Sequence, residues 1–284
     1  MGADNQQLGH EVPFFIVSEC PTPQLCAGSD RRRQGPKTLT VAADGADRPL
    51  HPVQDWPVMG ILATVVNVFV DETGEHGNPL GIVWASTATR GREQDIAADL
   101  GFSETVFIDE VDGRTVRARI FTPKQELRFA GHPTVGLAAW LRAAGDDIRH
   151  VVVPAGSARV RADGDLTWIS ADVDWAPEFE LERLDSPGEV DAVDPDAYTE
   201  GMHYVWAWLD EEEGRVRTRM FAPGLGIRTD EATGSAAIRL TAALGRDLQI
   251  EQGAGSRLFT HRRNLGREVE VGGRTTAGRD VELA

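Results

Sequence analysis

The feature of this sequence that most limits its possible folds is an internal repeat. The first copy comprises residues 119–123 (Arg-Ile-Phe-Thr-Pro) and then 129–139; the second comprises 219–223 (Arg-Met-Phe-Ala-Pro) and then 230–238. In both copies an alternating segment ends at a proline, and a loop with ionisable residues leads into a helix rich in small residues. Chance similarity is the alternative, but order, spacing and chemistry agree over the whole unit. We interpret the repeat as a duplicated α/β half-molecule with its site between the halves.

The composition is that of a soluble globular protein. The 284 residues allow a substantial core, and 41% of them are hydrophobic and 26% charged. A net charge of −16 opposes nucleic acid or an anionic membrane as a main partner, because phosphate binding needs a basic face. No segment has the roughly 18 apolar residues of a membrane span, and the N-terminus lacks a secretory pattern. We expect a cytoplasmic protein that binds neither nucleic acid nor membranes.

Residues 1–58 differ in composition and pattern from the rest of the chain. They are rich in proline and show no sustained period, so we expect a loosely ordered N-terminal extension. One hypothesis is that Met59, where patterned sequence begins, is the native start. After it we expect two halves, residues 59–150 and 151–284, the second shortened and its last strands free to pack on the first half.

The cysteines also fall in this extension. Cys20 and Cys26 are the only two in the sequence, so the remaining chain offers no thiol for catalysis and needs no oxidising compartment.

Strands and helices alternate in the predicted first half. The pattern predicts strands at 65–70, 81–86, 104–108 and 114–121, and helices at 92–100 and 133–144. The second of these helices is apolar almost all round, so it must be enclosed. Because strands flank it in sequence, we picture a curled sheet wrapped around a central helix.

The second half repeats this scheme. Predicted strands lie at 151–153, 157–162, 166–170, 203–209, 215–222, 258–261, 268–271 and 280–283. We expect a hairpin across residues 210–214 and a second central helix at 234–244. Residues 172–198 are acidic, contain prolines and are poorly patterned, so we expect a surface loop there.

The motifs that are missing leave acid–base chemistry as the main candidate. The sequence has no Walker A motif, no G-x-G-x-x-G after a strand, no H-E-x-x-H, no C-x-x-C and no G-x-S-x-G. The seven histidines are dispersed, which gives no support to a histidine-based metal site. Carboxylates and histidine therefore remain as the groups that could move protons.

Two predicted helix starts carry candidate site residues. His132 stands at the start of the first central helix, and Asp230 lies just before the second, which has Ser235 in its first turn. Helix N-termini offer unpaired N–H groups that suit a substrate carboxylate, so two facing termini could grip an anion below an acid–base pair. The alternatives are an ordinary capping role for Asp230 and a structural cap or core hydrogen bond for His132.

Glu104 is ambiguous from its pattern. A glutamate that opens an apolar strand is usually a solvent-facing edge residue. If instead it faces the cleft, partial burial would raise its pKa and prepare it for proton transfer near neutral pH.

Five motifs in the right order give the chain a family resemblance. They are Phe69…Gly77-Asn78-Pro79, Ser103-Glu104-Thr105-Val106-Phe107, Arg119-Ile120-Phe121-Thr122-Pro123, Gly131-His132-Pro133-Thr134 and Asp230-Glu231-Ala232-Thr233-Gly234-Ser235, with Val271-Gly272-Gly273 also fitting. Over residues 62–284 the chain resembles the PhzF-like phenazine biosynthesis proteins.

The resemblance implies a fold and an activity. The fold is the α+β, diaminopimelate-epimerase-like fold: two pseudo-symmetric halves, each a curled sheet or barrel around a central helix. The activity is that of a cofactor-free isomerase, usually a homodimer, that moves a proton on a dihydro-3-hydroxyanthranilate-like acid without a metal. Glu104, His132 and Asp230 would be catalytic, with Gly131, Gly234 and Ser235 binding the substrate. The epimerase relatives use a cysteine pair, which this region lacks.

Three departures from the family pattern keep a second hypothesis open. Glu231 replaces the usual proline after Asp230, the segment between the central helices is short, and residues 1–58 have no counterpart. The alternative is therefore a non-catalytic small-molecule binding protein that retains the fold.

Overall fold

The structure, a computed structural model, describes residues 61–283. The predictions about residues 1–58, the two cysteines and Met59 lie outside these residues. In the described part of the chain, the strands are β1 Ile61–Val70, β2 Asn78–Trp84, β3 Glu104–Asp112, β4 Thr115–Phe121, β5 Glu126–Leu127, β6 His150–Val153, β7 Gly156–Asp163, β8 Leu166–Asp172, β9 Glu180–Arg183, β10 His203–Asp210, β11 Arg215–Ala222, β12 Ile227–Asp230, β13 Leu248–Gln252, β14 Ser256–Arg263, β15 Glu268–Thr275 and β16 Arg279–Leu283. The α-helices are α1 Glu93–Leu100, α2 Gly131–Ala143, α3 Pro187–Ala192 and α4 Gly234–Leu244.

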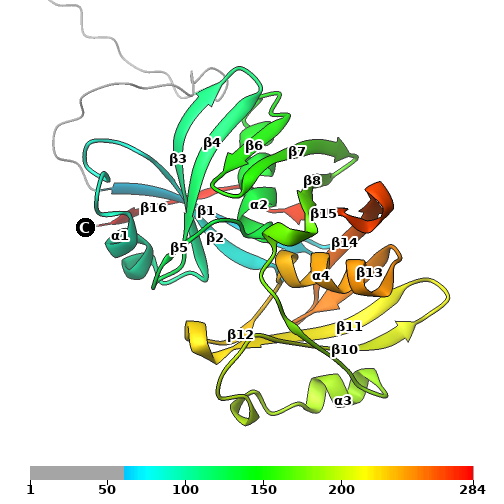
Figure 1. Ribbon diagram of the computed structural model, residues 1–284. Helices are drawn as coiled ribbons and strands as arrows, with labels where there is room; N and C mark the ends of the chain where they lie inside the picture. The colour runs from blue at the N-terminus through cyan, green and yellow to red at the C-terminus, as the bar shows by residue number, and fades with distance from the viewer. Residues whose placement is uncertain (1–60, 284) are drawn as a thin grey trace, which may run out of the picture. The chain divides into compact units, whose positions relative to one another are not determined.

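The first half is a closed barrel. Its strands follow the order β1-β2-β3-β4-β6-β7-β8-β15, and β15 pairs back onto β1, which completes the ring. Figure 1 shows α2 within this ring. β16 is an added antiparallel strand that pairs with the N-terminal part of β1. The prediction of a curled sheet around the first central helix is confirmed.

The second half has the same plan but does not close. From β15 the sheet continues through β14, β13, β11 and β10 and ends at β9, and α4 packs against β14 and β15. The parallel pair β9–β10 with its connecting helix α3 repeats the parallel pair β2–β3 with α1. No strand among residues 61–283 takes the place beside β9 that β1 takes beside β2.

The repeated Arg-x-Phe segments form equivalent strands. Arg119 in β4 lies over the ring of Phe121, with its Cζ 5.7 Å from the ring centroid, and Arg219 in β11 lies over Phe221 at 4.9 Å. Each arginine also reaches its own crossover segment: Arg119 binds Glu93 of α1, and Arg219 donates to the Val193 carbonyl just after α3. The repeat therefore builds the sheet and its helices, and its arginines have structural partners.

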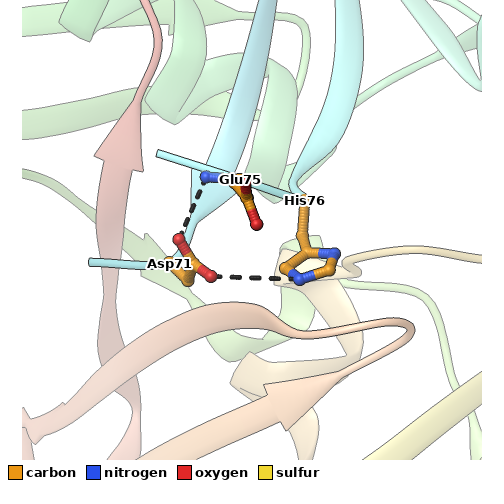
Figure 2. Close-up of side chains that lie close together, drawn as sticks. All are labelled: Asp71, Glu75 and His76. Carbon is orange, nitrogen blue, oxygen red and sulfur yellow. Dashed lines mark hydrogen bonds and ion pairs between the residues drawn. The ribbon is translucent and has the colours of Figure 1, made fainter. Parts of the chain in front are cut away.

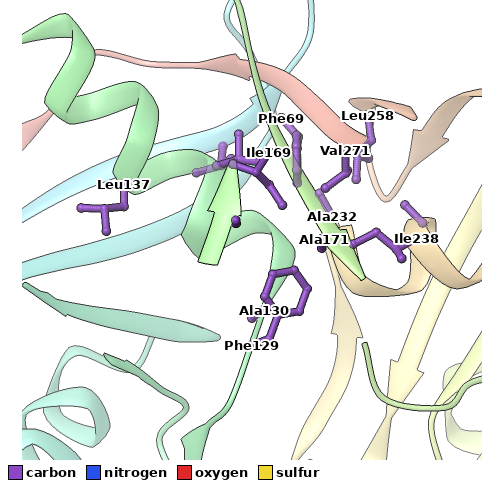
Figure 3. Packing of buried hydrophobic residues seen from close by; sticks show 14 of the residues in the cluster. Phe69, Phe129, Ala130, Leu137, Ile169, Ala171, Ala232, Ile238, Leu258 and Val271 are labelled. Carbon is purple, nitrogen blue, oxygen red and sulfur yellow. The ribbon is translucent and has the colours of Figure 1, made fainter. Parts of the chain in front are cut away.

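One apolar core joins the two halves. Leu137 of α2, Ile238 of α4 and Val271 of the shared strand β15 belong to the same cluster (Figure 3). Phe69 is buried within it at a shift in the β1–β15 register, with a left-handed φ of 68°. Gly273 makes room for this ring, since a Cβ atom there would lie 2.5 Å from the Phe69 Cδ1 atom.

Several predicted elements need correction. The prediction of a surface loop over residues 172–198 is wrong, because that segment contains β9 and α3. Ser186 caps α3, Pro187 lies in its first turn and Val190 is its buried residue. A helix of six residues is too short to show a helical repeat of apolar positions, so the sequence did not indicate it. The strands β5, β12 and β13 were not predicted, and α2 begins two residues earlier than expected, at Gly131. The helix predicted at 234–244 and the strand predicted at 215–222 are confirmed.

Candidate active site

The site lies where the N-termini of α2 and α4 meet. Gly131 begins α2 and Gly234 begins α4, and a Cβ atom added at Gly131 would lie 2.8 Å from the Gly234 Cα atom. Only glycine allows two backbones to approach so closely. Neither helix has a side-chain hydrogen bond at its N-cap, so these first turns present free backbone N–H groups. The structure thus brings together the two helix starts singled out in the sequence.

Glu104 faces this junction instead of solvent. It is 9% exposed, and its Oε2 atom lies 3.4 Å from Nδ1 of His132, which is 2% exposed. Glu104 Oε2 and His132 Nε2 have no hydrogen-bond partner in the structure. A solvent-facing edge position for Glu104 is therefore wrong: β3 starts beside β2 inside the barrel, and its first side chain is enclosed.

Burial changes the protonation of both groups. Burial and the negative charge of Asp230 raise the pKa of Glu104 from 4.5 to about 8. Burial lowers the pKa of His132 from 6.5 to about 3, and a nearby Pro79 carbonyl offsets this only in part. At neutral pH His132 is therefore neutral and the Glu104 carboxyl is mostly protonated, so their contact is not an ion pair.

Asp230 is buried but fully hydrogen-bonded. Its Oδ1 atom accepts a hydrogen bond of 2.7 Å from Asn78 Nδ2, and Oδ2 accepts one of 2.6 Å from the Thr233 hydroxyl. Burial raises its pKa to about 6, while the bonds from Thr233 and Asn78 oppose that rise. The N-cap of α4 is Thr233, so the alternative that Asp230 caps this helix is wrong.

Glu231, the residue that departs from the family pattern, is held by the chain around the β13–β14 turn. Its carboxylate accepts hydrogen bonds from the Ala254 amide and, at 2.8 Å, from the Ser256 hydroxyl. Ala254 lies in the turn between β13 and β14, and Ser256 begins β14. The extra carboxylate therefore anchors the loop after β12 to this turn.

Sequence reasoning missed the polar support of the site. Gln252 donates from Nε2 to the Asp230 carbonyl and to the Thr233 hydroxyl, and its Oε1 accepts from Tyr204. Gln252 and Tyr204 are fully buried. No sequence motif contains Gln252 or Tyr204. They lie in strands, and the sequence alone does not distinguish a buried polar residue of a strand from an exposed one. Asn78 does have a signal, its place in the Gly77-Asn78-Pro79 motif, but the motif does not indicate what its side chain binds.

Other clusters in the described region have local explanations. Asp71, Glu75 and His76 lie together in the turn after β1 (Figure 2), with potential ligand atoms within 4.8 Å of one another. Asp71 Oδ1 accepts hydrogen bonds from the amides of Thr73 and Glu75, so its carboxylate stabilises that turn.

A cavity of about 560 Å³ lies beside the open edge at β9, lined in part by Phe179 and Met202, away from Glu104.

The fold defines a class. A barrel around one helix, joined to a similar half around a second helix, is the diaminopimelate-epimerase-like fold. A hydroxyproline epimerase from Agrobacterium vitis, solved with bound trans-4-hydroxy-L-proline, shares the fold: its TM-score is 0.53 at 14% identity, covering 80% of this chain and 93% of that one.

Within this class, the chain belongs to the PhzF-type phenazine biosynthesis-like protein family, whose family model matches residues 66–187. It is 31% identical over 215 residues to a trans-2,3-dihydro-3-hydroxyanthranilate isomerase of Pseudomonas fluorescens, covering 62% of this chain and 77% of that protein. A PhzF-family structure from Enterococcus faecalis matches with a TM-score of 0.64 at 20% identity, covering 79% of this chain and all of that one. The protein is thus an isomerase of this family. None of the helices among residues 61–283 has the length and apolar composition to cross a membrane.

Proposed function

We propose that this protein is a cofactor-free isomerase that moves a proton on a small unsaturated carboxylic acid, of the dihydro-3-hydroxyanthranilate type. The observation that carries the proposal is the free Oε2 atom of Glu104, buried beside His132 at the junction of two uncapped helices. A buried carboxyl oxygen without a hydrogen-bond partner is costly, and such groups concentrate at functional sites.

The groups have distinct roles in this mechanism. In its ionised form, Glu104 takes a proton from a ring carbon of the substrate and returns that proton to another carbon of the conjugated system. A pKa of about 8 suits a group that must both accept and donate a proton near neutral pH. Neutral His132 donates or accepts a hydrogen bond at the reacting atoms, and Asp230 supplies a fixed negative charge.

The helix junction binds the substrate carboxylate. The backbone N–H groups of Gly131, Gly234 and Ser235 lie in the first turns of α2 and α4, where the helix dipoles favour an anion. This arrangement would orient the ring so that its reacting carbons face Glu104. The homodimer expected from the family resemblance is part of the proposal and can be checked by light scattering.

A second candidate is a binding protein that has lost turnover. The observation in its favour is the open second half, which lacks a strand beside β9 within the described chain. The intact and closely placed Glu104, His132 and Asp230 favour the enzyme.

The test is NMR of trans-2,3-dihydro-3-hydroxyanthranilate in D₂O with the wild type and with Glu104→Gln. We expect deuterium to enter the ring with the wild type and the rate to fall roughly 1,000-fold in the mutant. The matched control is Glu110→Gln on the same strand, since Glu110 is exposed and pairs with Arg117 at the surface. Full activity in a folded Glu104→Gln variant would remove Glu104 from the mechanism.

Ligand-dependent shifts in protein resonances without any deuterium uptake would support the binding protein instead. His132→Ala separates binding from turnover: we expect kcat to fall more than the affinity for substrate. A loss of affinity alone would make His132 a substrate anchor.

A further inference from the structure

Asn78 joins the two halves at the site. This first residue of β2 is 3% exposed, and its Nδ2 donates hydrogen bonds to Asp230 Oδ1 at 2.7 Å and to the Ala232 carbonyl at 2.9 Å. Its Oδ1 accepts a hydrogen bond of 3.2 Å from the Ser103 hydroxyl. Both amide hydrogens are thus used by the second half, and the amide oxygen by the first.

The partners fix the orientation of this amide. Turning it over would place its oxygen against a carboxylate and a carbonyl, which are both acceptors. The backbone is fixed as well: Gly77 has a left-handed φ of 80°, its amide donates to the Ser256 hydroxyl, and a Cβ atom there would meet Val70. The amide has one orientation that satisfies all its neighbours.

The partners of Asn78 also lie beside the acid–base groups. Ser103 directly precedes Glu104, and Asp230 carries the charge that acts on Glu104. Both oxygens of Asp230 accept hydrogen bonds, whereas Glu104 Oε2 accepts none. The Asp230 carboxylate is therefore held in place, while Glu104 Oε2 is free to exchange a proton.

We propose that Asn78 is a positioning residue of this isomerase, whose amide holds the Asp230 carboxylate at a fixed place relative to Glu104. The proposal rests on the proposed function for its effect on turnover, but its effect on Asp230 is independent of the reaction. Asn78 touches the carboxylate and its loop, and acts on the substrate only through them.

Removing the amide changes the titration of Asp230 in a defined direction. The bond from Asn78 favours the charged form, so Asn78→Ala should raise the Asp230 pKa above its value of about 6. Asp230 then carries less charge near neutral pH, and the pKa of Glu104 should fall. The other titratable groups around Asp230 are Glu231 beside it, Tyr204 of β10 and, beyond Glu104, His132 of α2.

The first measurement is a ¹³C NMR titration of the Asp and Glu side-chain carboxyls without substrate. We expect the Asp230 pKa to rise by about one unit in Asn78→Ala. The matched control is Asn67→Ala, because Asn67 is half-buried on the neighbouring strand β1, opposite Pro79. It should leave the Asp230 titration unchanged.

The second measurement is deuterium uptake by the probe substrate in D₂O. We expect kcat to fall roughly 100-fold in Asn78→Ala, the usual cost of a small misplacement, with little change in KM. Ser103→Ala removes the hydroxyl that donates to the amide oxygen of Asn78 and that also lowers the pKa of Glu104. It should raise the Asp230 pKa and lower kcat, each by less than Asn78→Ala does. If Asn78→Ala does not fold, Ser103→Ala carries the test.

The outcomes separate the two proposals. An unchanged Asp230 titration in folded Asn78→Ala or, where that variant does not fold, in Ser103→Ala overturns the positioning role. A shifted titration with wild-type turnover also overturns it, because the carboxylate would then not need to be held. If the wild type itself exchanges no deuterium, the proposed function fails for this substrate, while the carboxyl titration still decides whether Asn78 holds Asp230.

Discussion

The two halves of this molecule follow one plan and end differently. In the first, β1 pairs with β2 on one side and with β15 on the other, so the sheet closes around α2. In the second, the equivalent edge stops at β9, and α4 is covered by a partial barrel. Both helices nevertheless deliver their N-termini to the same point. A closed barrel is thus not required to position a helix terminus; the shared strand β15 and one common core are enough.

The contact between the helix ends is the feature most sensitive to mutation. In Gly131→Ala the new Cβ would overlap the backbone of Gly234, so the helices must move apart and the Glu104–His132 geometry is lost. We expect a loss of isomerase activity of roughly 100-fold or more. Gly224→Ala is the control, since a Cβ there has no neighbour within 4 Å. Equal activity in both variants would show that the close approach is dispensable.

Hydrogen exchange compares the closed and open edges directly. Amides of β2 lie between two strands, whereas β9 pairs only with β10 in the described chain. We expect β9 amides to exchange roughly 100-fold faster than those of β2, because an edge strand opens locally at lower free energy. Mass spectrometry of peptides from the two strands measures this ratio. Equal protection would mean that β9 is covered by another chain or segment.

The buried carboxyl of Glu104 should make stability depend on pH. Its pKa is about 8 in the folded protein and near 4.5 when exposed, so folding stability falls as the pH rises from about 4.5 to about 8. Glu104→Gln removes this dependence. Relative to the wild type, the mutant should be more stable at pH 8.5 than at pH 4, by roughly 4 kcal/mol. Urea unfolding at the two pH values checks this, with Glu110→Gln expected to show no such difference.

The repeated arginines, Arg119 and Arg219, occupy equivalent positions in the two halves but have different hydrogen-bond partners. Arg119 pairs with the carboxylates of Glu93 and Asp109, whereas Arg219 donates to backbone carbonyls in and just after α3. Replacing either by alanine should cost about 1–2 kcal/mol. Burial tends to raise the Glu93 pKa, but the bond from Arg119 brings it below its ordinary value. The Arg119→Ala cost should therefore shrink as pH falls below about 4.5, while the Arg219→Ala cost stays constant. Parallel pH profiles would contradict this assignment of partners.

Sequence alone predicts the repeated units of this fold well. The alternation over 114–121 and the apolar helix at 133–144 are strong signals, because each element buries a whole face. The short elements β9, α3 and β13 escape prediction, since a few residues at an edge or turn carry no period. Glu104 shows the same limit at the site. Its sequence context suits a surface strand, and only the register of β3 beside β2 reveals that it is enclosed.

The site was predictable to the extent that backbone signals marked it. Gly131 and Gly234 indicate two close helix starts, and His132 and Asp230 follow from their places beside them. Asn78 and Gln252 both hydrogen-bond to Asp230, which lies 152 positions from Asn78 and 22 positions from Gln252 in the sequence. No local pattern encodes such pairings, so they emerge only when the chain is folded.

The ring of the first half has a consequence for how the protein is made. The strand that completes it, β15, is far from β1 in sequence: Asn67 of β1 and Thr276, the residue directly after β15, are hydrogen-bonded to each other and are 209 residues apart. During synthesis, β1 and β8 leave the ribosome long before β15, which pairs with both of them. Until then each of the two strands has an unpaired edge. The nascent first half must be guarded from aggregation until β15 has been synthesised, and truncations that remove β15 or β16 should affect β1 first.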